Sequence, residues 1–249
     1  MIKEPKISLI LPTLNEENNI VELVERIEKC LPQICEIYIV DDGSKDRTID
    51  QINSLKSNFA NIHLIQRNEQ GLLSAIKRGI KESKAPLVAW MDCDLSHPPE
   101  LLTAMYDYCT WMNADCVLAS RYLPSSIDKT HQGKLFIKIH KLLSFMLNKI
   151  CQFLISSQIT DYTSGYIMVH RKRLETIDYS GDYGEYFMEL LWQLKNQRCS
   201  IFEVPFYSPP RKHGQSKTAT HIFGLFLNGQ KYLRKIISIT LVKLFRIGS

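Results

Sequence analysis

Two acidic clusters each follow directly on a short apolar run, and this repeated arrangement limits what the chain can fold into. The largely apolar residues 36–40 lead into the sequence DDGS at 41–44, and the apolar residues 86–91 lead into DCD at 92–94. Short apolar runs bounded by turn residues are typical of buried strands in a parallel sheet, and such sheets bind ligands beyond the carboxyl ends of their strands. We therefore expect both clusters to face one crevice.

The second cluster has the chemistry of a metal site. Carboxylates this close together repel one another unless a hard cation lies between them. Oxygen ligands with little His or Cys nearby suit Mg2+ or Mn2+, so Asp92 and Asp94 predict a site for one of these ions, and a diphosphate could bind to that ion. The sequence Asp-Gly-Ser after a strand also forms ordinary turns whose Asp caps the next helix, which leaves a purely structural role open for the first cluster.

Length and cysteine content favour one reduced α/β domain. The chain has 249 residues, of which 45% are hydrophobic, and this is enough for a full core. Its seven cysteines are scattered and never spaced as Cys-x-x-Cys, so we expect reduced thiols instead of a disulfide framework or a zinc site. Because the N-terminus leads straight into a strand pattern and no apolar stretch approaches about 20 residues, we expect a cytoplasmic protein that is neither exported nor membrane-spanning.

Positive charge is concentrated at the C-terminal end of the chain. Residues 200–249 contain eight Lys or Arg and one acidic residue, a net charge of +7, whereas the whole chain carries +5. Such asymmetry suits nucleic acid, an anionic membrane or a phosphorylated substrate. The sequence has neither an aromatic RNA-binding signature nor a helix-turn-helix pattern, so we expect no nucleic acid partner and favour phosphate or an anionic membrane surface.

Strand and helix patterns alternate along the first half of the chain. The predicted strands cover residues 7–11, 36–40, 62–66, 86–91 and 116–120, and the predicted helices cover residues 20–30, 48–55, 72–81 and 101–111. This alternation predicts an α/β fold with a mainly parallel sheet that helices cover on both faces. We place one main domain at residues 1–217 and a C-terminal amphipathic basic helix at residues 218–249.

The pattern changes at residues 134–155 to one long amphipathic helix. Nine of its apolar side chains fall within an arc of roughly 120°, and its lysines form a stripe that faces away: Lys134, Lys138, Lys141 and Lys149. A helix packed on a soluble core usually mixes both signs of charge on its outer face, so this acid-free helix resembles one that lies on a membrane surface. The alternative is a core-packed helix with a solvated lysine face. Residues 222–247 form a second such segment.

Six motifs occur in order along the chain: LPTLNE (11–16), VDDGSKDRT (40–48), MDCDLSHPP (91–99), SRY (120–122), DYTSGY (161–166), and EVP (203–205) followed by RKHGQSK (211–217). In this order they resemble the family 2 glycosyltransferases, and most closely the dolichol-phosphate or polyprenyl-phosphate mannose synthase group. The likeness covers residues 7 to about 217. It implies the GT-A fold, a Rossmann-like single domain that binds a nucleotide sugar, with amphipathic helices at a membrane interface.

The resemblance also implies a role for individual residues. The nucleotide pocket would be lined by Pro12, Leu14, Glu16, Val40 and Asp42, with Asp42 on the base or ribose. Leu14 stands where a Tyr is usual in the family, and this departure weakens the identification of the donor.

The resemblance places a second group of residues at the phosphates. Asp92, Cys93 and Asp94 would lie at the diphosphate, with Asp92 and Asp94 on the metal ion and Ser96 as a third metal ligand. Phosphates of donor and acceptor would be bound by Arg121, Arg211 and Lys217, which together with Asp94 are the residues we predict to be catalytic. Ile167 departs from the family because a basic residue often follows the Ser-Gly-aromatic motif.

The reaction implied is the transfer of a hexose, mannose or glucose, from a GDP or UDP sugar to a polyprenyl or dolichyl phosphate, with Mg2+ or Mn2+ as cofactor. We place the enzyme peripherally at the cytoplasmic face of a membrane. An acceptor phosphate with a second pKa of about 6 is already ionised at neutral pH, so no strong general base is needed, and direct displacement would invert the anomeric centre. We therefore interpret His97 and His213 as structural or phosphate-contacting residues, and Asp161 as a substrate-positioning or turn residue.

Two alternatives remain open at this stage. Asp-x-Asp after a strand also serves aspartyl-phosphate chemistry, in which Asp92 would be the nucleophile of a phosphatase or phosphotransferase. The chain could also be a catalytically silent, membrane-associated nucleotide-binding protein that keeps the fold for interaction only. The first alternative does not account for the motifs at 41–44 and 211–217, and the intact charged residues argue against the second.

Overall fold

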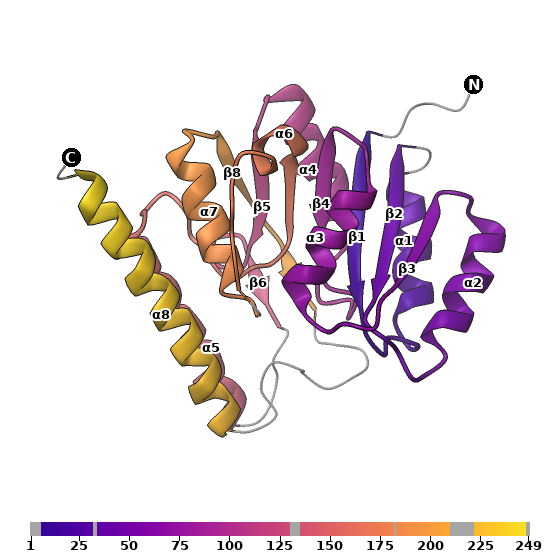
Figure 1. Ribbon diagram of the computed structural model, residues 1–249, viewed down its shortest axis with the longest axis horizontal. Helices are drawn as coiled ribbons and strands as arrows, with labels where there is room; N and C mark the ends of the chain where they lie inside the picture. The colour runs from indigo at the N-terminus through magenta and orange to yellow at the C-terminus, as the bar shows by residue number, and fades with distance from the viewer. Residues whose placement is uncertain (1–5, 32–33, 130–134, 182, 210–221, 248–249) are drawn as a thin grey trace.

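The computed structural model describes residues 6–31, 34–129, 135–181, 183–209 and 222–247. The central sheet of this part of the chain has seven strands in the order β3-β2-β1-β4-β7-β5-β8 (Figure 1). The strands are β1 (Ile7–Thr13), β2 (Cys35–Asp41), β3 (Ile62–Gln66), β4 (Leu87–Trp90), β5 (Cys116–Ser120), β7 (Ile167–His170) and β8 (Ile201–Pro205). A two-stranded sheet joins β6 (Ile127–Asp128) to β9 (Tyr207–Ser208).

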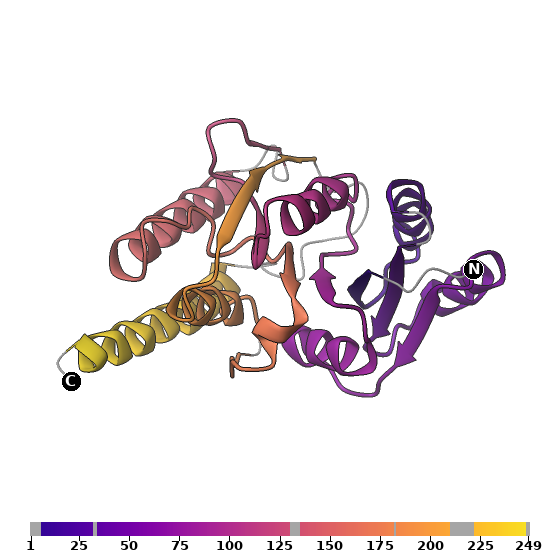
Figure 2. The same ribbon diagram turned by 90° about the horizontal axis from the view of Figure 1, so that it is seen from above.

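Helices cover both faces of the central sheet, as the alternating pattern predicts (Figure 2). The helices are α1 (Ile20–Cys30), α2 (Thr48–Asn58), α3 (Leu72–Glu82), α4 (Leu101–Trp111), α5 (Leu135–Leu154), α6 (Arg171–Leu174), α7 (Tyr186–Asn196) and α8 (Ile222–Ile247). Side chains of α1, α2 and α4 share one core cluster, and side chains of α3, α7 and α8 share the other.

The alternation of side chains along each strand produces these two cores. In β1, Leu9 and Leu11 pack in the cluster with α1, whereas Ile10 points to the opposite face and packs with α3. Gly79 allows α3 to approach that face closely, because a Cβ at this position would lie 2.5 Å from the Cγ2 atom of Ile10. Apolar runs that are buried on both faces therefore belong to the sheet interior, as the sequence indicates.

The predicted strands and helices of the first 120 residues are confirmed, with shifts of no more than three residues at their ends. What the alternating pattern did not predict is β7, which lies between β4 and β5 and runs antiparallel to both. All other neighbouring pairs in the central sheet are parallel. Strand order depends on packing between distant segments, which a local pattern does not specify. The expected domain boundary at residue 217 lies outside the described residues.

The helices α5 and α8 lie side by side at one end of the molecule (Figures 1 and 2). Helix α8 packs against α7 as well, where Lys235 Nζ lies 2.7 Å from Glu189 Oε2. None of the helices in the described parts of the chain is long and apolar enough to cross a membrane. The two helices thus form an additional layer that packs on α7.

Helix α5 turns a mixed side toward the protein, with Ser144, Asn148 and the core residue Cys151, and turns most of its large apolar side chains outward. Asn148 is buried and Ser144 is half-buried, whereas Leu142 is 58% exposed and Phe153 is 87% exposed. We name as the outer apolar face nine of the exposed apolar side chains of the two helices: Leu142, Leu143, Met146, Ile150 and Phe153 of α5, and Leu233, Ile237, Leu241 and Phe245 of α8. The alternative of a core-packed helix is correct in part, because Cys151 is buried in the core and Leu147 and Leu154 pack against it, whereas most of the predicted apolar face is exposed.

Candidate functional site

The carboxyl ends of β1, β2, β4 and β5 bring the predicted site residues to one edge of the central sheet. Trp90 of β4 and Leu118 of β5 both pair with Ile167 of β7, so the end of β4 lies level with Leu118, two residues before the end of β5. Ile10 of β1 pairs with Trp90, and Thr13 pairs with Asp41 at the end of β2. The residues that follow these strands must therefore emerge beside one another.

The loops after β1 and β2 are hydrogen-bonded to each other. The backbone N–H of Asn15 donates to Ser44 Oγ at 2.8 Å, and the backbone N–H of Glu16 donates to Thr48 Oγ1 at 2.8 Å. Asn15 has a φ of 52°, a left-handed conformation that Asn tolerates better than most residues. The first two motifs thus form one continuous rim of the site.

Asp41 and Asp42 have different roles in this rim. Asp41 is buried, and its Oδ1 accepts hydrogen bonds from the backbone N–H groups of Gly43 and Ser44, each at 2.9 Å. The Ser44 hydroxyl also donates to the Asp41 carboxylate. The structural reading of Asp-Gly-Ser as a turn is therefore correct for Asp41, while Asp42 remains the candidate for a ligand.

The carboxylate of Asp42 is held by Arg67, a residue that the motifs did not single out. Arg67 Nε donates to Asp42 Oδ1 at 2.8 Å, Nη2 lies 2.7 Å from the same oxygen, and Gly71 N donates to Oδ2 at 3.0 Å. Both side chains are almost fully buried, so this is an ion pair away from solvent. Arg67 directly follows β3, which neighbours β2 in the sheet, and its position after a strand was the one signal available in the sequence.

The Asp-x-Asp loop after β4 is held in a tight, strained conformation. Leu95 has a φ of 62°, which is an outlier for a bulky side chain. This turn lets Asp94 Oδ1 accept hydrogen bonds from the backbone N–H of Ser96 at 3.0 Å and from its Oγ at 2.6 Å. The structure therefore uses the Ser96 hydroxyl to orient Asp94, the residue for which the resemblance implies a metal-binding role.

His97 has a structural place in this loop. Its Nδ1 accepts a hydrogen bond from the backbone N–H of Asp92 at 3.1 Å, and its ring stacks on Tyr166 with centroids 4.9 Å apart. Burial lowers the pKa of His97, and the nearby Asp92 and Asp94 carboxylates oppose this effect only in part. A neutral imidazole that accepts a hydrogen bond at Nδ1 agrees with the interpretation of His97 as a structural residue.

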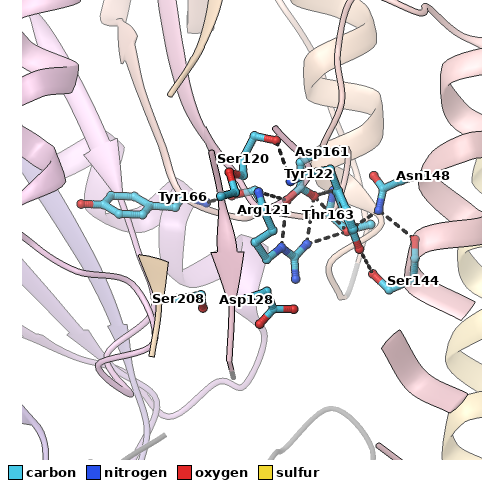
Figure 3. A network of polar contacts seen from close by, with 12 residues as sticks. Ser120, Arg121, Tyr122, Asp128, Ser144, Asn148, Asp161, Thr163, Tyr166 and Ser208 are labelled. Atoms are coloured by element: carbon cyan, nitrogen blue, oxygen red, sulfur yellow. Dashed lines mark hydrogen bonds and ion pairs between the residues drawn. The ribbon is translucent and has the colours of Figure 1, made fainter. Parts of the chain in front are cut away.

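Arg121 follows β5 and forms a bidentate ion pair with Asp161 (Figure 3). Its Nε donates to Oδ2 at 2.8 Å, its Nη2 donates to Oδ1 at 2.9 Å, and its backbone N–H donates to Oδ2 at 3.1 Å. Burial lowers the pKa of Arg121, but the adjacent Asp161 carboxylate raises it by more than burial lowers it. The net pKa of Arg121 therefore lies well above that of an ordinary arginine. Asp161, which is fully buried, is therefore a positioning partner of Arg121.

The remaining predicted residues have different surroundings. The side chains of Val40 and Cys93 are buried in the two cores, so only their backbone could face a nucleotide. Cys93 Sγ donates to the carbonyl oxygen of Pro12 at 3.4 Å and lies 3.4 Å from Thr13 Oγ1, which joins the loops after β1 and β4. Leu14 and Glu16 lie on the rim. Arg211 and Lys217 lie outside the described residues.

Asp92 and Asp94 remain the candidate ligands of the predicted metal ion. Asp92 and Asp94 provide carboxylate oxygens, and Mg2+ sites that serve phosphate substrates commonly use one or two carboxylates and complete the shell with phosphates and water. Among the residues that the structure describes, no three His, Cys, Asp or Glu side chains form a metal-binding cluster.

Comparison with known proteins identifies the family. The model of glycosyl transferase family 2 matches residues 8–178. The chain is 32% identical over 214 residues to dolichol-phosphate mannosyltransferase of Pyrococcus furiosus. The aligned part covers 85% of this chain and 59% of that protein. It is 32% identical to polyprenol monophosphomannose synthase of Mycolicibacterium smegmatis, with 84% of this chain and 79% of that protein covered.

A solved structure with the same fold is glucosyl-3-phosphoglycerate synthase of Mycobacterium tuberculosis in complex with Mn2+, UDP and glucosyl-3-phosphoglycerate. Its TM-score is 0.70 at 17% sequence identity, with 95% of this chain and 80% of that chain covered. The same enzyme in complex with Mg2+ and UDP has a TM-score of 0.69. The α/β architecture with its mostly parallel sheet is thus the GT-A fold, and this chain, whose motifs after β1, β2, β4 and β5 meet at one edge of that sheet, belongs to the family 2 glycosyltransferases.

Proposed function

We propose that this protein transfers a hexose from a nucleotide diphosphate sugar to a polyprenyl or dolichyl phosphate, with inversion at the anomeric carbon. The observation that carries the proposal is the meeting of Asp42, the Asp92 and Asp94 loop, and Arg121 at one edge of the sheet. Relatives named for mannosyl transfer to dolichol phosphate or for polyprenol monophosphomannose synthesis support mannose as the hexose and a prenyl phosphate as the acceptor.

We assign one task to each part of this edge. Asp42, held by Arg67 and Gly71 N–H, would accept hydrogen bonds from the base or ribose of the donor. Asp92 and Asp94 would hold a Mg2+ or Mn2+ ion, which when bound supplies positive charge to the diphosphate leaving group. Arg121 would donate to phosphate oxygens. Its bidentate pair with Asp161 uses Nε and Nη2, so the third nitrogen of the guanidinium, Nη1, points away from that carboxylate (Figure 3).

The acceptor brings its own nucleophile. A phosphate monoester with a second pKa of about 6 is ionised at neutral pH, so its oxygen attacks the anomeric carbon without losing a proton to the enzyme. A reaction without a general base agrees with the place of His97, whose Nδ1 already accepts a hydrogen bond from the protein backbone. The main catalytic task of the protein is then to stabilise the charge on the departing nucleotide diphosphate.

A binding screen followed by a transfer assay tests this function. We expect GDP or UDP with Mn2+ to raise the melting temperature, since a ligand at 100 times its Kd adds about 2.7 kcal/mol of stability. The matching nucleotide sugar should then label a short prenyl phosphate. Nucleotide binding without any transfer would support the catalytically silent alternative, and a trapped phosphoaspartate at Asp92 would support the phosphotransferase.

The outer apolar face provides the means to reach a water-insoluble acceptor. We propose that it inserts into the interfacial region of a membrane, with nearby lysines on anionic headgroups. Lys149 is exposed, whereas Lys141 turns toward the protein, with its Nζ 2.8 Å from the carbonyl oxygen and 3.4 Å from the carboxylate of Asp128. The expected stripe of four outward lysines is therefore wrong at Lys141. Lys134 and the side chain of Lys138 lie outside the described residues.

We expect the triple substitution of Leu142, Met146 and Phe153 with Gln to release the protein from anionic vesicles. These side chains are at least half exposed, and losing about 1 kcal/mol of apolar contact for each should weaken vesicle binding about 100-fold. Sedimentation with vesicles measures the binding, and circular dichroism confirms the fold. Trp111 at the end of α4 is 81% exposed, so Trp111→Gln is a matched control that should bind normally. Equal binding of the triple variant and the control would contradict the membrane proposal.

We expect Arg211→Ala to lower turnover strongly without affecting folding. The residue lies in a polar, Gly-containing sequence, and surface substitutions usually alter stability by under about 0.5 kcal/mol, so the melting temperature should stay within about two degrees. Loss of one phosphate contact should reduce kcat/KM by about 10 to 100-fold. Lys172→Ala, at an exposed position on α6, is the control. A large loss of stability with unchanged kinetics would instead identify Arg211 as a structural residue.

A further inference from the structure

Asn148 is an unusual residue in its helix. It is 1% exposed in the middle of α5, and buried Asn is tolerated only where its amide is fully hydrogen-bonded. Its Oδ1 accepts from the backbone N–H of Tyr162 at 2.6 Å, and its Nδ2 donates to the carbonyl oxygen of Ser144 at 2.9 Å and to Thr163 Oγ1 at 3.0 Å. The amide therefore ties α5 to the segment that contains Asp161.

The hydroxyl of Thr163 connects this amide to Arg121 (Figure 3). Its oxygen accepts from Arg121 Nη2 at 2.8 Å and from Asn148 Nδ2 at 3.0 Å, and it donates to Asp161 Oδ1 at 3.2 Å. A hydroxyl has one donor and two acceptor positions, so all three are used. The hydrogen bond from Asn148 thereby determines which way the hydroxyl points and keeps its second lone pair on Arg121.

A second contact joins the same two parts of the protein one helical turn earlier. Ser144 Oγ lies 2.9 Å from the hydroxyl of Tyr122, the residue that follows Arg121. Positions 144 and 148 are on one side of α5, the side opposite to the outer apolar face. The helix that we propose to lie on the membrane is thus hydrogen-bonded, through its inner polar side, to the immediate surroundings of Arg121.

We propose that Asn148 is a positioning residue for Arg121, through which the placement of α5 controls the orientation of the guanidinium toward the phosphate it binds. This inference rests on the proposed role of Arg121 in phosphate binding. A displacement of α5 relative to the sheet would break the hydrogen bond to Thr163, free the hydroxyl to rotate and loosen Arg121. Correct orientation of a group at the reacting phosphates has a large effect on rate, because a misplacement of about 1 Å can cost about 100-fold.

Four variants test the proposal by steady-state kinetics. Asn148→Ala and Thr163→Val should each lower kcat by about 10 to 100-fold with little change in the KM for the nucleotide sugar. Thr163→Ser keeps the hydroxyl and should retain activity within about threefold. Gln152→Ala is the matched control, because Gln152 also joins α5 to the neighbouring loop, by donating to the carbonyl oxygen of Thr160 at 3.0 Å, without contacting Arg121. It should stay within about twofold of the wild type.

A double-mutant cycle separates positioning from a general structural effect. If Asn148 acts through Arg121, adding Asn148→Ala to Arg121→Lys should lower kcat by no more than about twofold further. An undiminished loss in the Arg121→Lys background would overturn the proposal, because Asn148 would then act independently. Equal losses in Asn148→Ala and Gln152→Ala would likewise overturn it, since any weakening of α5 would have the same effect.

A spectroscopic measurement makes the test independent of sugar transfer. In protein labelled with 15N-arginine, the Nε–Hε signal of Arg121, identified by its loss in Arg121→Lys, should shift or broaden in Asn148→Ala and Thr163→Val but not in Gln152→Ala. An unchanged signal in both variants would show that Asn148 does not position Arg121. If the wild-type protein transferred no sugar, the proposed function would fail while this measurement still decided the positioning role.

Discussion

Replacing Asp94 with Asn should lower the rate of sugar transfer by about 10^3. The amide oxygen of Asn can still accept the hydrogen bonds from Ser96 N–H and Oγ–H, so the loop should keep its shape while it loses the negative charge. A divalent ion would then be held by Asp92 alone, and the diphosphate would lose most of its neutralising charge. We would measure kcat/KM with Mn2+ and, by calorimetry, the affinity for GDP and UDP with Mn2+ and with EDTA.

The control for this substitution is Asp107→Asn, at an exposed position on α4 away from the sheet edge. It should leave both the kinetics and the metal dependence unchanged. Two results would contradict the assignment of Asp94. One is equal nucleotide affinity of the wild-type protein in Mn2+ and in EDTA. The other is an Asp94→Asn variant that still shows the full effect of Mn2+ on nucleotide binding.

Replacing Asp161 with Ala should destabilise the folded protein by about 3 kcal/mol. Asp161 is fully buried and accepts three hydrogen bonds from Arg121, so its removal leaves a guanidinium that is largely enclosed by protein without its counter-charge. The expected result is a lower midpoint of urea unfolding with an unchanged slope. We also expect turnover to fall, because Arg121 would no longer be held at the sheet edge.

A solvent-exposed ion pair of similar length provides the comparison. Arg78 Nε lies 2.9 Å from Glu82 Oε1, but the two side chains are 49% and 45% exposed, and such pairs contribute about 0.5 kcal/mol. Glu82→Ala should therefore change the unfolding free energy much less than Asp161→Ala. Similar losses in the two variants would show that burial of the Arg121 and Asp161 pair does not determine its contribution.

The positions of most strands and helices could be predicted because they depend on local periodicity. The alternation that buries Leu9 and Ile10 on opposite faces of β1, and the helical spacing of Ile20, Leu23 and Ile27, are properties of neighbouring residues. The same holds for the acidic cluster that contains Asp92 and Asp94, which is recognisable from its place after an apolar run. The edge of a parallel sheet at which ligands bind follows from strand direction alone.

The partners of the charged side chains were decided by the tertiary structure. Asp42 is held by Arg67 and Arg121 by Asp161, pairs that are 25 and 40 residues apart and that meet only because of the order of the strands. The antiparallel strand β7 separates β4 from β5, and the chain just before it supplies Asp161. Sequence motifs identified Asp42, Arg121 and Asp161 individually, but no local pattern specifies which segments become neighbours.

Helix α5 shows most clearly the difference between what the sequence determines and what the tertiary structure decides. Its sequence determines that one side is apolar and the other polar, because a period of 3.6 residues separates the two sides. It does not determine that the side with Ser144 and Asn148, which also carries the core residue Cys151, turns toward the protein. The structure buries the side with Ser144 and Asn148 and exposes Leu142 and Phe153, since the inner side meets hydrogen-bonding groups at Tyr122, Tyr162 and Thr163 that only the folded chain brings together.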